Sequence, residues 1–289
     1  ISSADDLYAI QTFGFRGEAI PSIAAVSKVE IITRAPDRIS ATRIVIEGGV
    51  IRSVSEKGAP AGTQFTVRQL FFNTPARQKF MKSAATEYSH ILNMLQRQAL
   101  AQPQINFRLL NGERETLNLP PAGSIGDRLA LVWGNEIAEQ LRFGEAGLDG
   151  VRVRAYFGTP ALTRSNRDHQ FFFLNRRPIT NRLLMKALSD AYRGVVMSDR
   201  FPVAFVFVDI DPALVDVNIH PTKREVRFAE PNAVTEQLVN AFRSAFVVAE
   251  QSRRQPPAPP APAPGRVAPL RDEPLFQRIR IDDGDLPAA

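Results

Sequence analysis

Two glycines frame a basic side chain near the start of the chain. The segment GFRGEAI holds Gly14, Phe15, Arg16, Gly17 and Glu18. Because glycine lacks a Cβ, successive backbone N–H groups at such a site can point into one concavity and surround a phosphate. A helix that starts near Glu18 would add the positive end of its dipole. The same spacing is also typical of a turn that only opens a helix, so the segment alone indicates either.

Two later segments could also contact phosphate. Thr63 follows Gly62 at the start of an expected strand, where its hydroxyl could reach a phosphate. A simple strand-to-helix corner is the preferred interpretation of that segment alone. Lys223 follows Pro221 in DVNIHPTKREVRF, and a lysine on a rigid turn suits a point contact with a terminal phosphate. An exposed loop charge explains Lys223 equally simply.

A cluster of arginines follows an aromatic-rich strand. Arg176, Arg177 and Arg182 lie within LNRRPITNR, next to the run FFF. Such a cluster can contact nucleic-acid phosphates without reading base sequence. A solvated turn is an equally good interpretation at this stage.

Composition narrows the class of protein. The chain has 289 residues, a net charge of +6 and no cysteine. The charge favours polyanionic partners, although a basic surface kept for solubility is nearly as good an explanation. The absence of cysteine excludes disulfides, thiolate zinc sites and cysteine nucleophiles. Three distant histidines offer no metal-ligand spacing, and no apolar run reaches the roughly 18 residues of a membrane span, so we expect a cytoplasmic protein.

Periodicity predicts the elements of the first half. Alternating β-branched runs at 28–34, 41–47 and 50–56 predict an antiparallel meander, with a further strand over 62–73. Helices are predicted over about 1–10, with Ser3 as N-cap, and from Thr74 with Pro75 in the first turn. Another helix covers 87–101. Its apolar stripe consists of Tyr88, Ile91, Leu92, Leu95 and Ala99.

The second half begins with a predicted helix that starts with a capping box of Ser124 and Asp127 and ends at Gly134. After this helix, the predicted order of elements is β, β, α, β, α. The expected order is strands at 151–158 and 169–175, a turn over 175–181, a helix over 182–194, a strand over 201–210 buried on both faces, and a helix over 232–250. We expect domains at 1–122 and 123–250. The Pro-rich segment 251–289 is expected to be a disordered linker, within which EPLFQ could bind a sliding clamp, although a plain spacer is preferred.

Four segments together resemble one family. FGFRGEAIPSIAAVS, GTQFTVRQLFFNTPARQKFMKS, FFFLNRRPI and DVNIHPTKREVRF look like the signatures of the MutL family of DNA mismatch repair proteins, in the same order. The resemblance covers about residues 1–250. It implies an α/β (α+β) fold. In the implied arrangement, the chain begins with part of an ATPase sandwich of the gyrase, Hsp90, histidine kinase and MutL superfamily. A ribosomal-protein-like βαβ domain follows.

The resemblance also implies an activity. MutL proteins bind and slowly hydrolyse ATP with Mg²⁺, and ATP dimerises their N-terminal regions into a clamp on DNA. Implied partners are DNA, a second copy, a mismatch-sensing MutS-type protein, and in some members a sliding clamp, helicase or endonuclease. A bacterial, nucleoid-associated protein is implied, with no membrane partner.

The resemblance assigns the family's site residues to individual positions of this chain. The resemblance assigns Gly14, Phe15, Arg16, Gly17 and Glu18 to the phosphate-side lid motif, with Ile20 where Leu is usual. It assigns Gly62 and Thr63 to the Gly-Thr motif beside the nucleotide. Lys223 matches the γ-phosphate lysine, and Asn218 lies in the same motif.

One part of the family pattern lies upstream of these motifs. The general-base Glu, the magnesium-holding Asn and the Asp-x-Gly-x-Gly adenine site precede them in the family and are not among residues 1–289. Because the chain starts inside its first expected helix, we expect a fragment that alone neither hydrolyses ATP nor binds it well. The alternative function is a nucleic-acid-binding module without nucleotide chemistry. A type II topoisomerase fits less well, because GFRGEA and HPTKREV are not found there in this form.

Overall fold

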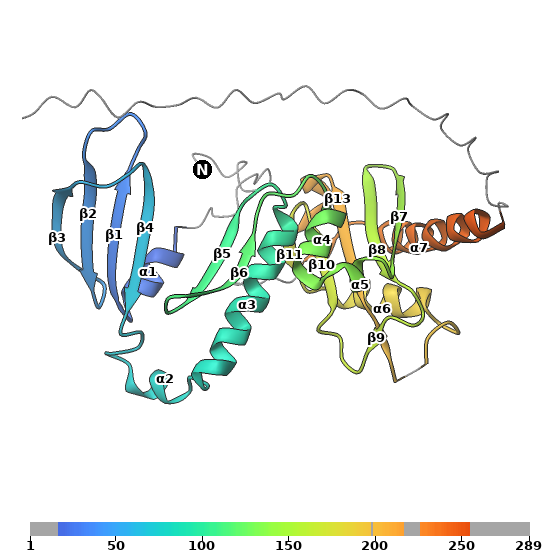
Figure 1. Ribbon diagram of the computed structural model, residues 1–289, viewed down its shortest axis with the longest axis horizontal. Helices are drawn as coiled ribbons and strands as arrows, with labels where there is room; N and C mark the ends of the chain where they lie inside the picture. The colour runs from blue at the N-terminus through green and yellow to red at the C-terminus, as the bar shows by residue number, and fades with distance from the viewer. Residues whose placement is uncertain (1–16, 198, 217–225, 255–289) are drawn as a thin grey trace, which may run out of the picture.

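The computed structural model describes residues 17–197, 199–216 and 226–254 (Figure 1). Two sheets stand at opposite ends of the described part of the chain, and a long helix, α3, runs between them (Figure 1). The helix predicted over residues 1–10 lies outside the described residues.

The first sheet has the order β3-β2-β1-β4 and is antiparallel throughout. Its strands are β1 (Lys28–Arg34), β2 (Ala41–Glu47), β3 (Val50–Lys57) and β4 (Gly62–Arg68), preceded by helix α1 (Ala19–Ala24). The predicted meander of the first three strands is confirmed. The prediction that the fourth strand runs to residue 73 is wrong: Gln69 and Phe71 have φ of 51° and 67°, and left-handed residues cannot continue a strand.

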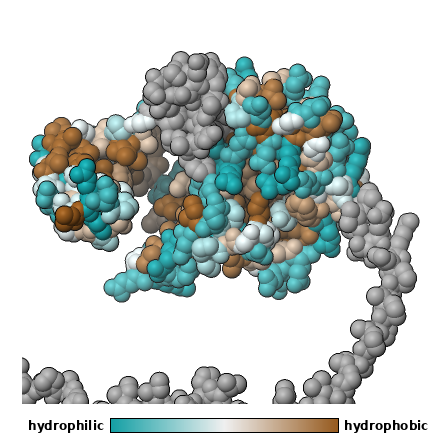
Figure 2. Space-filling view, turned by 90° about the horizontal axis from the view of Figure 1, so that it is seen from above, coloured by the Kyte–Doolittle hydropathy of each residue, from teal (hydrophilic) through white to brown (hydrophobic). Residues whose placement is uncertain are grey.

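Much of the first sheet is exposed. All eight residues of β3 are exposed, and Ile51 and Val54 keep 61% and 62% of their accessible surface. Figure 2 shows apolar surface on this lobe. The larger hydrophobic cores therefore lie elsewhere in the described chain.

The connection between the sheets contains α2 (Pro75–Lys79), α3 (Ala84–Ala101), and a hairpin of β5 (Phe107–Asn111) and β6 (Arg114–Leu119). Thr74 is the N-cap residue of α2 as predicted, although its hydroxyl makes no capping bond. The predicted stripe on α3 is buried only at its end: Ala99 is fully buried, whereas Ile91 is 47% exposed. The sequence analysis did not predict the hairpin.

The second sheet has the order β11-β10-β13-β8-β7. Its strands are β7 (Leu141–Leu148), β8 (Val151–Gly158), β10 (Gln170–Leu174), β11 (Arg177–Ile179) and β13 (Ala204–Ile210). The surrounding elements are α4 (Ile125–Trp133), α5 (Asn135–Ala138), β9 (Thr163–Arg164), α6 (Arg182–Ala191), β12 (Phe201–Pro202), the 3-10 turn η2 (Pro212–Leu214), β14 (Val215–Asp216), β15 (Arg227–Phe228) and α7 (Pro231–Arg254).

Strand β13 lies at the centre of this sheet. It pairs in parallel with β10 and antiparallel with β8, and six of its seven residues are buried. The expectation of a strand buried on both faces is therefore confirmed. The connection β10–α6–β13 forms the predicted βαβ unit.

The two faces of the second sheet bury two separate cores. On one face, Val153, Val206 and Leu174 pack with residues of α6 and α7 such as Leu184 and Leu238. The opposite face presents its own buried residues to the end of α3 and to α4 and its neighbours. That core contains Leu100, Ala101, Leu129, Leu141, Leu162, Phe171, Phe173, Val203, Phe205 and Phe207. Layers of helix thus lie on both sides of the sheet.

Two strands of the second sheet differ from the prediction. Strand β7 was not predicted, because Gly144 and Gly147 interrupt its apolar pattern. The segment 175–181, predicted as a turn, contains a turn at Asn175 and Arg176 followed by the edge strand β11. Because both turn residues have positive φ, they make a hairpin instead of an open loop.

The capping box of α4 is confirmed. Ser124 Oγ accepts a hydrogen bond from the Asp127 backbone N–H at 3.0 Å and donates to Asp127 Oδ2 at 2.8 Å. Gly134, with φ of 86°, ends the helix as predicted. This capping box lies just after residue 122, where we expect the domain boundary. One core contains Leu100 and Ala101 from before that residue and Leu129 from after it, so the boundary stays a prediction.

A buried arginine strengthens the same junction. Arg128 is fully buried, and its Nη2 donates to the carbonyl oxygen of Ile105 at 2.8 Å and also to that of Pro103. Desolvation lowers the pKa of this guanidinium. The segment after α3 is therefore tied to α4 by hydrogen bonds from inside the core.

Among the described residues, no helix combines the length and the hydropathy that a bilayer crossing requires.

Helix α7 approaches β7 closely at Gly144, and we predict that Gly144→Ala is strongly destabilising. A Cβ at this position would lie 2.0 Å from the carbonyl oxygen of Ala241, a backbone atom that cannot move alone. Ser244 fixes the same contact, because its Oγ accepts from the Glu145 N–H at 3.1 Å. We expect the free energy of unfolding to fall by about 3 kcal/mol or more in urea titrations.

Gly126→Ala is the matched control, because its Cβ would meet only ordinary contacts at 3.5 Å. Its effect should stay within about 1 kcal/mol. Equal stability of the Gly144→Ala variant and the parent protein would contradict the close approach.

We also predict a contribution of His169 to the pH dependence of stability. Burial, and then the charge of Arg164, lower the pKa of this half-buried imidazole, while Asp168 acts in the opposite direction. A lowered folded-state pKa means that the contribution is fully present above the unfolded-state value of about 6.5. It is lost as the pH falls through the folded-state pKa. Melting temperatures between pH 8 and pH 5 should therefore fall less in His169→Gln than in the parent protein, and parallel curves would contradict this role.

Candidate functional site

The described part of the lid motif leads directly into α1. Gly17 has φ of 66°, and Glu18 occupies the N-cap position of the helix, as predicted. A Cβ on Gly17 would meet nothing within 4 Å, so the left-handed backbone, and not crowding, favours glycine there. Gly14, Phe15 and Arg16 lie outside the described residues.

The C-terminal end of α1 is fixed to the first sheet. The Ala24 carbonyl accepts from the Gly49 N–H at 2.8 Å, and the Val26 carbonyl accepts from the Phe71 N–H at 2.7 Å. Asn73 adds a side-chain bond to the Ala25 carbonyl at 2.9 Å. The helix that follows the lid motif therefore has a firm base in the turns between β2 and β3 and after β4.

The Gly-Thr motif opens β4. Gly62 has φ of 128°, a region that side-chain-bearing residues rarely adopt, and a Cβ there would meet open space. Thr63 is exposed, and its hydroxyl lies 2.8 Å from that of Thr33 on the neighbouring strand. The backbone and the hydroxyl are thus both accessible to a ligand.

Arg34 holds the loop that precedes Gly62. It pairs with Gly62 in the register of β1 and β4. Its guanidinium donates to the carbonyl oxygens of Ala59 at 2.8 Å and Arg38 at 2.6 Å. These bonds fix the two loops at this end of the sheet.

The described residues show no hydrogen bond between these two motifs, that is, between the Gly17–Glu18 segment and Gly62 or Thr63. Residue Lys28, which follows α1, and Gly62 lie at opposite ends of the β1–β4 ladder. Asn218 and Lys223, the remaining nucleotide-side residues, lie outside the described residues.

The three arginines of the cluster, Arg176, Arg177 and Arg182, differ in how far they are buried. Arg176 and Arg182 are exposed, whereas Arg177 on β11 is half-buried, and desolvation lowers the pKa of its guanidinium. Arg182 opens α6, which Asn181 caps by accepting from the Leu184 N–H at 3.1 Å. The cluster therefore offers two exposed cations and one that is partly withdrawn from solvent.

A groove lies beside Arg176 that the sequence analysis did not predict. We call it the β8 groove: a hollow of about 430 Å³ on the open half of the second sheet. Its lining includes Phe143, Arg152, Arg154, Tyr156, Phe173, Arg176, Asp209, and Leu100 and Ala101 of α3. The alternation in VRVRAYFG could have indicated it, because a period of two places Arg152, Arg154 and Tyr156 on one face.

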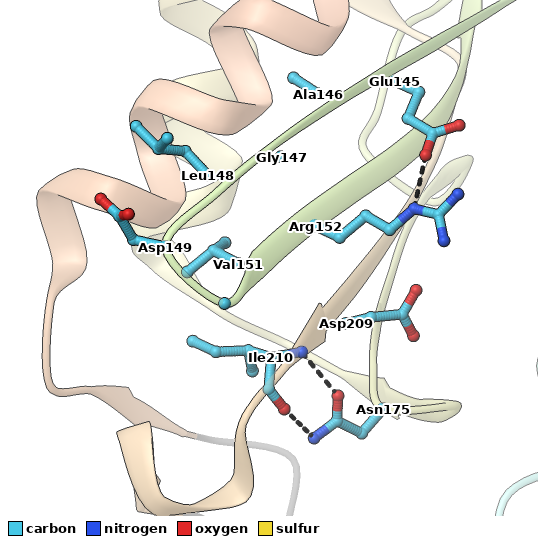
Figure 3. Close-up of a pocket in the computed structure, with 11 residues that line it drawn as sticks. Glu145, Ala146, Gly147, Leu148, Asp149, Val151, Arg152, Asn175, Asp209 and Ile210 are labelled. Carbon is cyan, nitrogen blue, oxygen red and sulfur yellow. Dashed lines mark hydrogen bonds and ion pairs between the residues drawn. The ribbon is translucent and has the colours of Figure 1, made fainter.

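A second hollow continues the β8 groove toward the β7–β8 turn (Figure 3). Glu145 pairs with Arg152 across the strands, and Asp209 lies beside them (Figure 3). Asn175 clamps the backbone of Ile210, donating to its carbonyl at 2.9 Å and accepting from its N–H at 3.0 Å. The positions of the groove's charges are thus set by the sheet and by this clamp.

The described residues do not offer a metal cluster. Over 17–197, 199–216 and 226–254, no group of three or more histidine, aspartate or glutamate side chains is placed to hold a metal ion. The described arrangement suits contacts with anions at Gly62, Thr63 and the exposed arginines.

Comparison with known proteins identifies relatives for most of the chain. A family model described as DNA mismatch repair protein, C-terminal domain, matches residues 129–247. The DNA mismatch repair protein MutL of Syntrophobacter fumaroxidans is 45% identical over 246 residues, which cover 85% of this chain and 37% of that protein. MutL of Symbiobacterium thermophilum is 44% identical, over 85% of this chain and 39% of that protein. The chain thus spans about two fifths of the length of these relatives.

Solved structures agree with these relatives. A crystal structure of the N-terminal domain of a DNA repair protein has a TM-score of 0.70 at 25% identity, and covers 86% of this chain and 79% of that one. The Aquifex aeolicus MutL ATPase domain complexed with ADP has a TM-score of 0.56 at 28% identity, over 73% and 76% of the two chains. The mixed α/β fold expected from the four motifs is confirmed, and the chain belongs to the MutL family of DNA mismatch repair proteins.

Proposed function

We propose that this chain acts in DNA mismatch repair as part of a nucleotide-controlled MutL protein. The observation that carries the proposal is the likeness over 73% of the chain to a MutL ATPase domain complexed with ADP. The relatives at 44–45% identity, all mismatch repair proteins, support the same role. Because the chain spans only part of those relatives, the activity of the whole protein belongs to this proposal.

The described residues fit a nucleotide phosphate. Gly62 has an open, left-handed backbone that lets a ligand approach its N–H, and Thr63 next to it has an exposed hydroxyl. Gly17 and Glu18 lead into α1, and we infer that the motif before them covers the phosphates. Magnesium would neutralise charge on the phosphates of bound ATP. The described residues offer no ligand cluster for it. Their role in this proposal is to bind and orient the nucleotide.

We infer further that nucleotide controls self-association. Lys223 would contact the γ-phosphate from the second half of the chain, with Asn218 beside it, so that binding would link the two halves. In this scheme ATP would favour a dimer of N-terminal regions that encloses DNA. A MutS-type protein, and then a sliding clamp, helicase or endonuclease, would act with that dimer.

DNA would be held through exposed cations. Arg176 and Arg182 are exposed on neighbouring elements, and the net charge of +6 supports a polyanionic partner. Arg177, which is half-buried, would contribute less. The same cations favour the second candidate function, a nucleic-acid-binding module whose affinity for DNA is independent of nucleotide.

Thr63→Val should weaken nucleotide binding in the complete protein. The lost hydroxyl removes a hydrogen bond to a charged group, worth about 1.5–3 kcal/mol, so the Kd for ATP should rise at least about tenfold. Thr33→Val is the matched control, because it removes the same Thr33–Thr63 bond but keeps the Thr63 hydroxyl. Isothermal titration of both variants checks this, and equal affinities would remove Thr63 from the proposed site.

Lys223→Ala should reduce nucleotide-driven dimerisation of the complete protein. Loss of the γ-phosphate contact leaves ATP unable to favour the dimer over the monomer. Sedimentation velocity with and without ATP measures the dimer fraction, and Lys79→Ala, an exposed lysine on α2, is the control. Unchanged dimerisation in Lys223→Ala would refute the role of this lysine. If ATP does not change the affinity of the parent protein for DNA, the second candidate function would be favoured.

A further inference from the structure

The loop that leads to Gly62 crosses one end of the first sheet. Strands β3 and β4 are the two edges of this sheet, and β2 and β1 lie between them (Figure 1). Lys57 at the end of β3 pairs with Ala41 on β2, while Gly62 pairs with Arg34 on β1. The loop 58–61 must therefore pass the ends of two strands before it reaches the Gly-Thr motif.

This crossing loop has little slack. Neighbouring strands lie about 4.8 Å apart, so the path from β3 to β4 covers roughly 14 Å. The chain from Lys57 to Gly62 spans at most about 18 Å when it is fully extended. Pro60 favours such a course, because the residue before a proline is biased toward an extended backbone. The crossing loop therefore runs nearly straight into Gly62, where φ is 128°.

The crossing loop has no side chain with which to hold itself in place. Its sequence is Gly-Ala-Pro-Ala, so only backbone groups can form hydrogen bonds. Within the described part of the chain, one hydrogen bond is found for residues 58–61. It is donated by Arg34 Nε to the carbonyl oxygen of Ala59 at 2.8 Å. The anchor of the crossing loop is therefore supplied by β1.

Arg34 also joins the crossing loop to a second loop. Its Nη1 donates at 2.6 Å to the carbonyl oxygen of Arg38, in the loop 35–40 between β1 and β2. A backbone hydrogen bond of 3.1 Å from the Arg38 N–H to the Ala35 carbonyl closes that second loop. Because a guanidinium presents several donors in fixed directions, one side chain can hold both carbonyls. The crossing loop is thus tied to a turn that is itself closed.

The Gly-Thr motif is supported by two successive residues of β1. Arg34 pairs with Gly62, and Thr33 pairs with Thr63 in the same ladder. The hydroxyls of Thr33 and Thr63 lie 2.8 Å apart, whereas Arg34 bonds the backbone that precedes Gly62. Successive side chains of a strand point to opposite faces, so the two supports act from different sides.

We propose that Arg34 is a positioning residue of the nucleotide site, which holds the Gly62 N–H and the Thr63 hydroxyl in the orientation that meets the ligand. The inference rests on the proposed function, and it needs no contact between Arg34 and the nucleotide. Without the guanidinium, the crossing loop loses its anchor and Gly62 can leave its left-handed backbone conformation. Ordering the freed segment again on binding costs conformational entropy and therefore affinity.

The test measures the affinity of the complete protein for adenosine 5′-(β,γ-imido)triphosphate, a non-hydrolysable ATP analogue, by isothermal titration. Arg34→Met keeps the aliphatic stem but removes both hydrogen bonds, and the Kd should rise about tenfold. Arg34→Lys can still donate to one of the two carbonyls, and the Kd should rise only about threefold.

Arg43→Met is the matched control. Arg43 lies on the neighbouring strand β2, and its guanidinium donates to the Glu30 side chain at 2.6 Å instead of to a loop. The Kd of this variant should stay within about twofold of the parent value. Melting temperatures show whether every variant is folded, and Arg34→Lys replaces Arg34→Met in each comparison if the methionine variant does not fold.

A double-mutant cycle separates positioning from a general effect on the sheet. If Arg34 acts through the Gly-Thr motif, Arg34→Met should weaken binding less in a Thr63→Val background than in the parent protein. An equal fold-change in both backgrounds would mean that the two residues act independently, and it would overturn the positioning role.

Two further outcomes separate this inference from the proposed function. Absence of nucleotide binding by the parent protein would overturn the proposed function and, with it, the role of Arg34. If the parent protein binds nucleotide, Thr63→Val weakens binding and Arg34→Met leaves it unchanged, this inference alone would be overturned. The same conclusion would follow if Arg43→Met weakened binding as much as Arg34→Met.

Discussion

The central strand of the second sheet must be buried on both faces, and this constraint shapes most of the described chain. This strand, β13, is apolar along almost its whole length and can be stable only between two layers. Helices α6 and α7 cover one face. They include the contact in which Gly144 lets the α7 backbone approach β7. The other face receives the end of α3 and α4, which cover only part of it, and the uncovered part is the charged β8 groove.

The same packing joins the two ends of the molecule. Helix α3 starts after the corner that follows β4 and ends at Leu100 and Ala101, which belong to the second core and also line the β8 groove. Arg128 ties the next segment to α4 through the carbonyls of Pro103 and Ile105. Its Nε and Nη1 are buried without a partner, so its desolvation is only partly compensated. A buried charge of this kind weakly supports stability but specifies one geometry for the junction.

Much of the fold could be predicted from local patterns, and the exceptions have physical causes. Strands β1, β2 and β3 follow from short β-branched runs separated by turn residues, and the start of α4 from a capping box whose two residues bond each other. Strand β7 was missed because glycines interrupt its pattern, yet Gly144 is there to accommodate α7, a contact 97 residues away in sequence (241 − 144). The β5–β6 hairpin had a usable signal, Asn111 followed by Gly112 with φ of 61°.

The candidate site was predictable to a different degree. Motif resemblance indicated Gly17, Gly62 and Thr63, and the unusual φ of both glycines gives their residue type a physical reason. Burial, which no local pattern reports, separated Arg177 from Arg176 and Arg182. The β8 groove requires four strands and two helices to meet, so only the alternation of Arg152, Arg154 and Tyr156 was visible beforehand. Because α3 is a single helix of 18 residues, about 27 Å long, its end cannot shift without moving Leu100 and Ala101. The groove therefore shares two lining residues with the helix that leads from the lobe that carries Gly62 and Thr63.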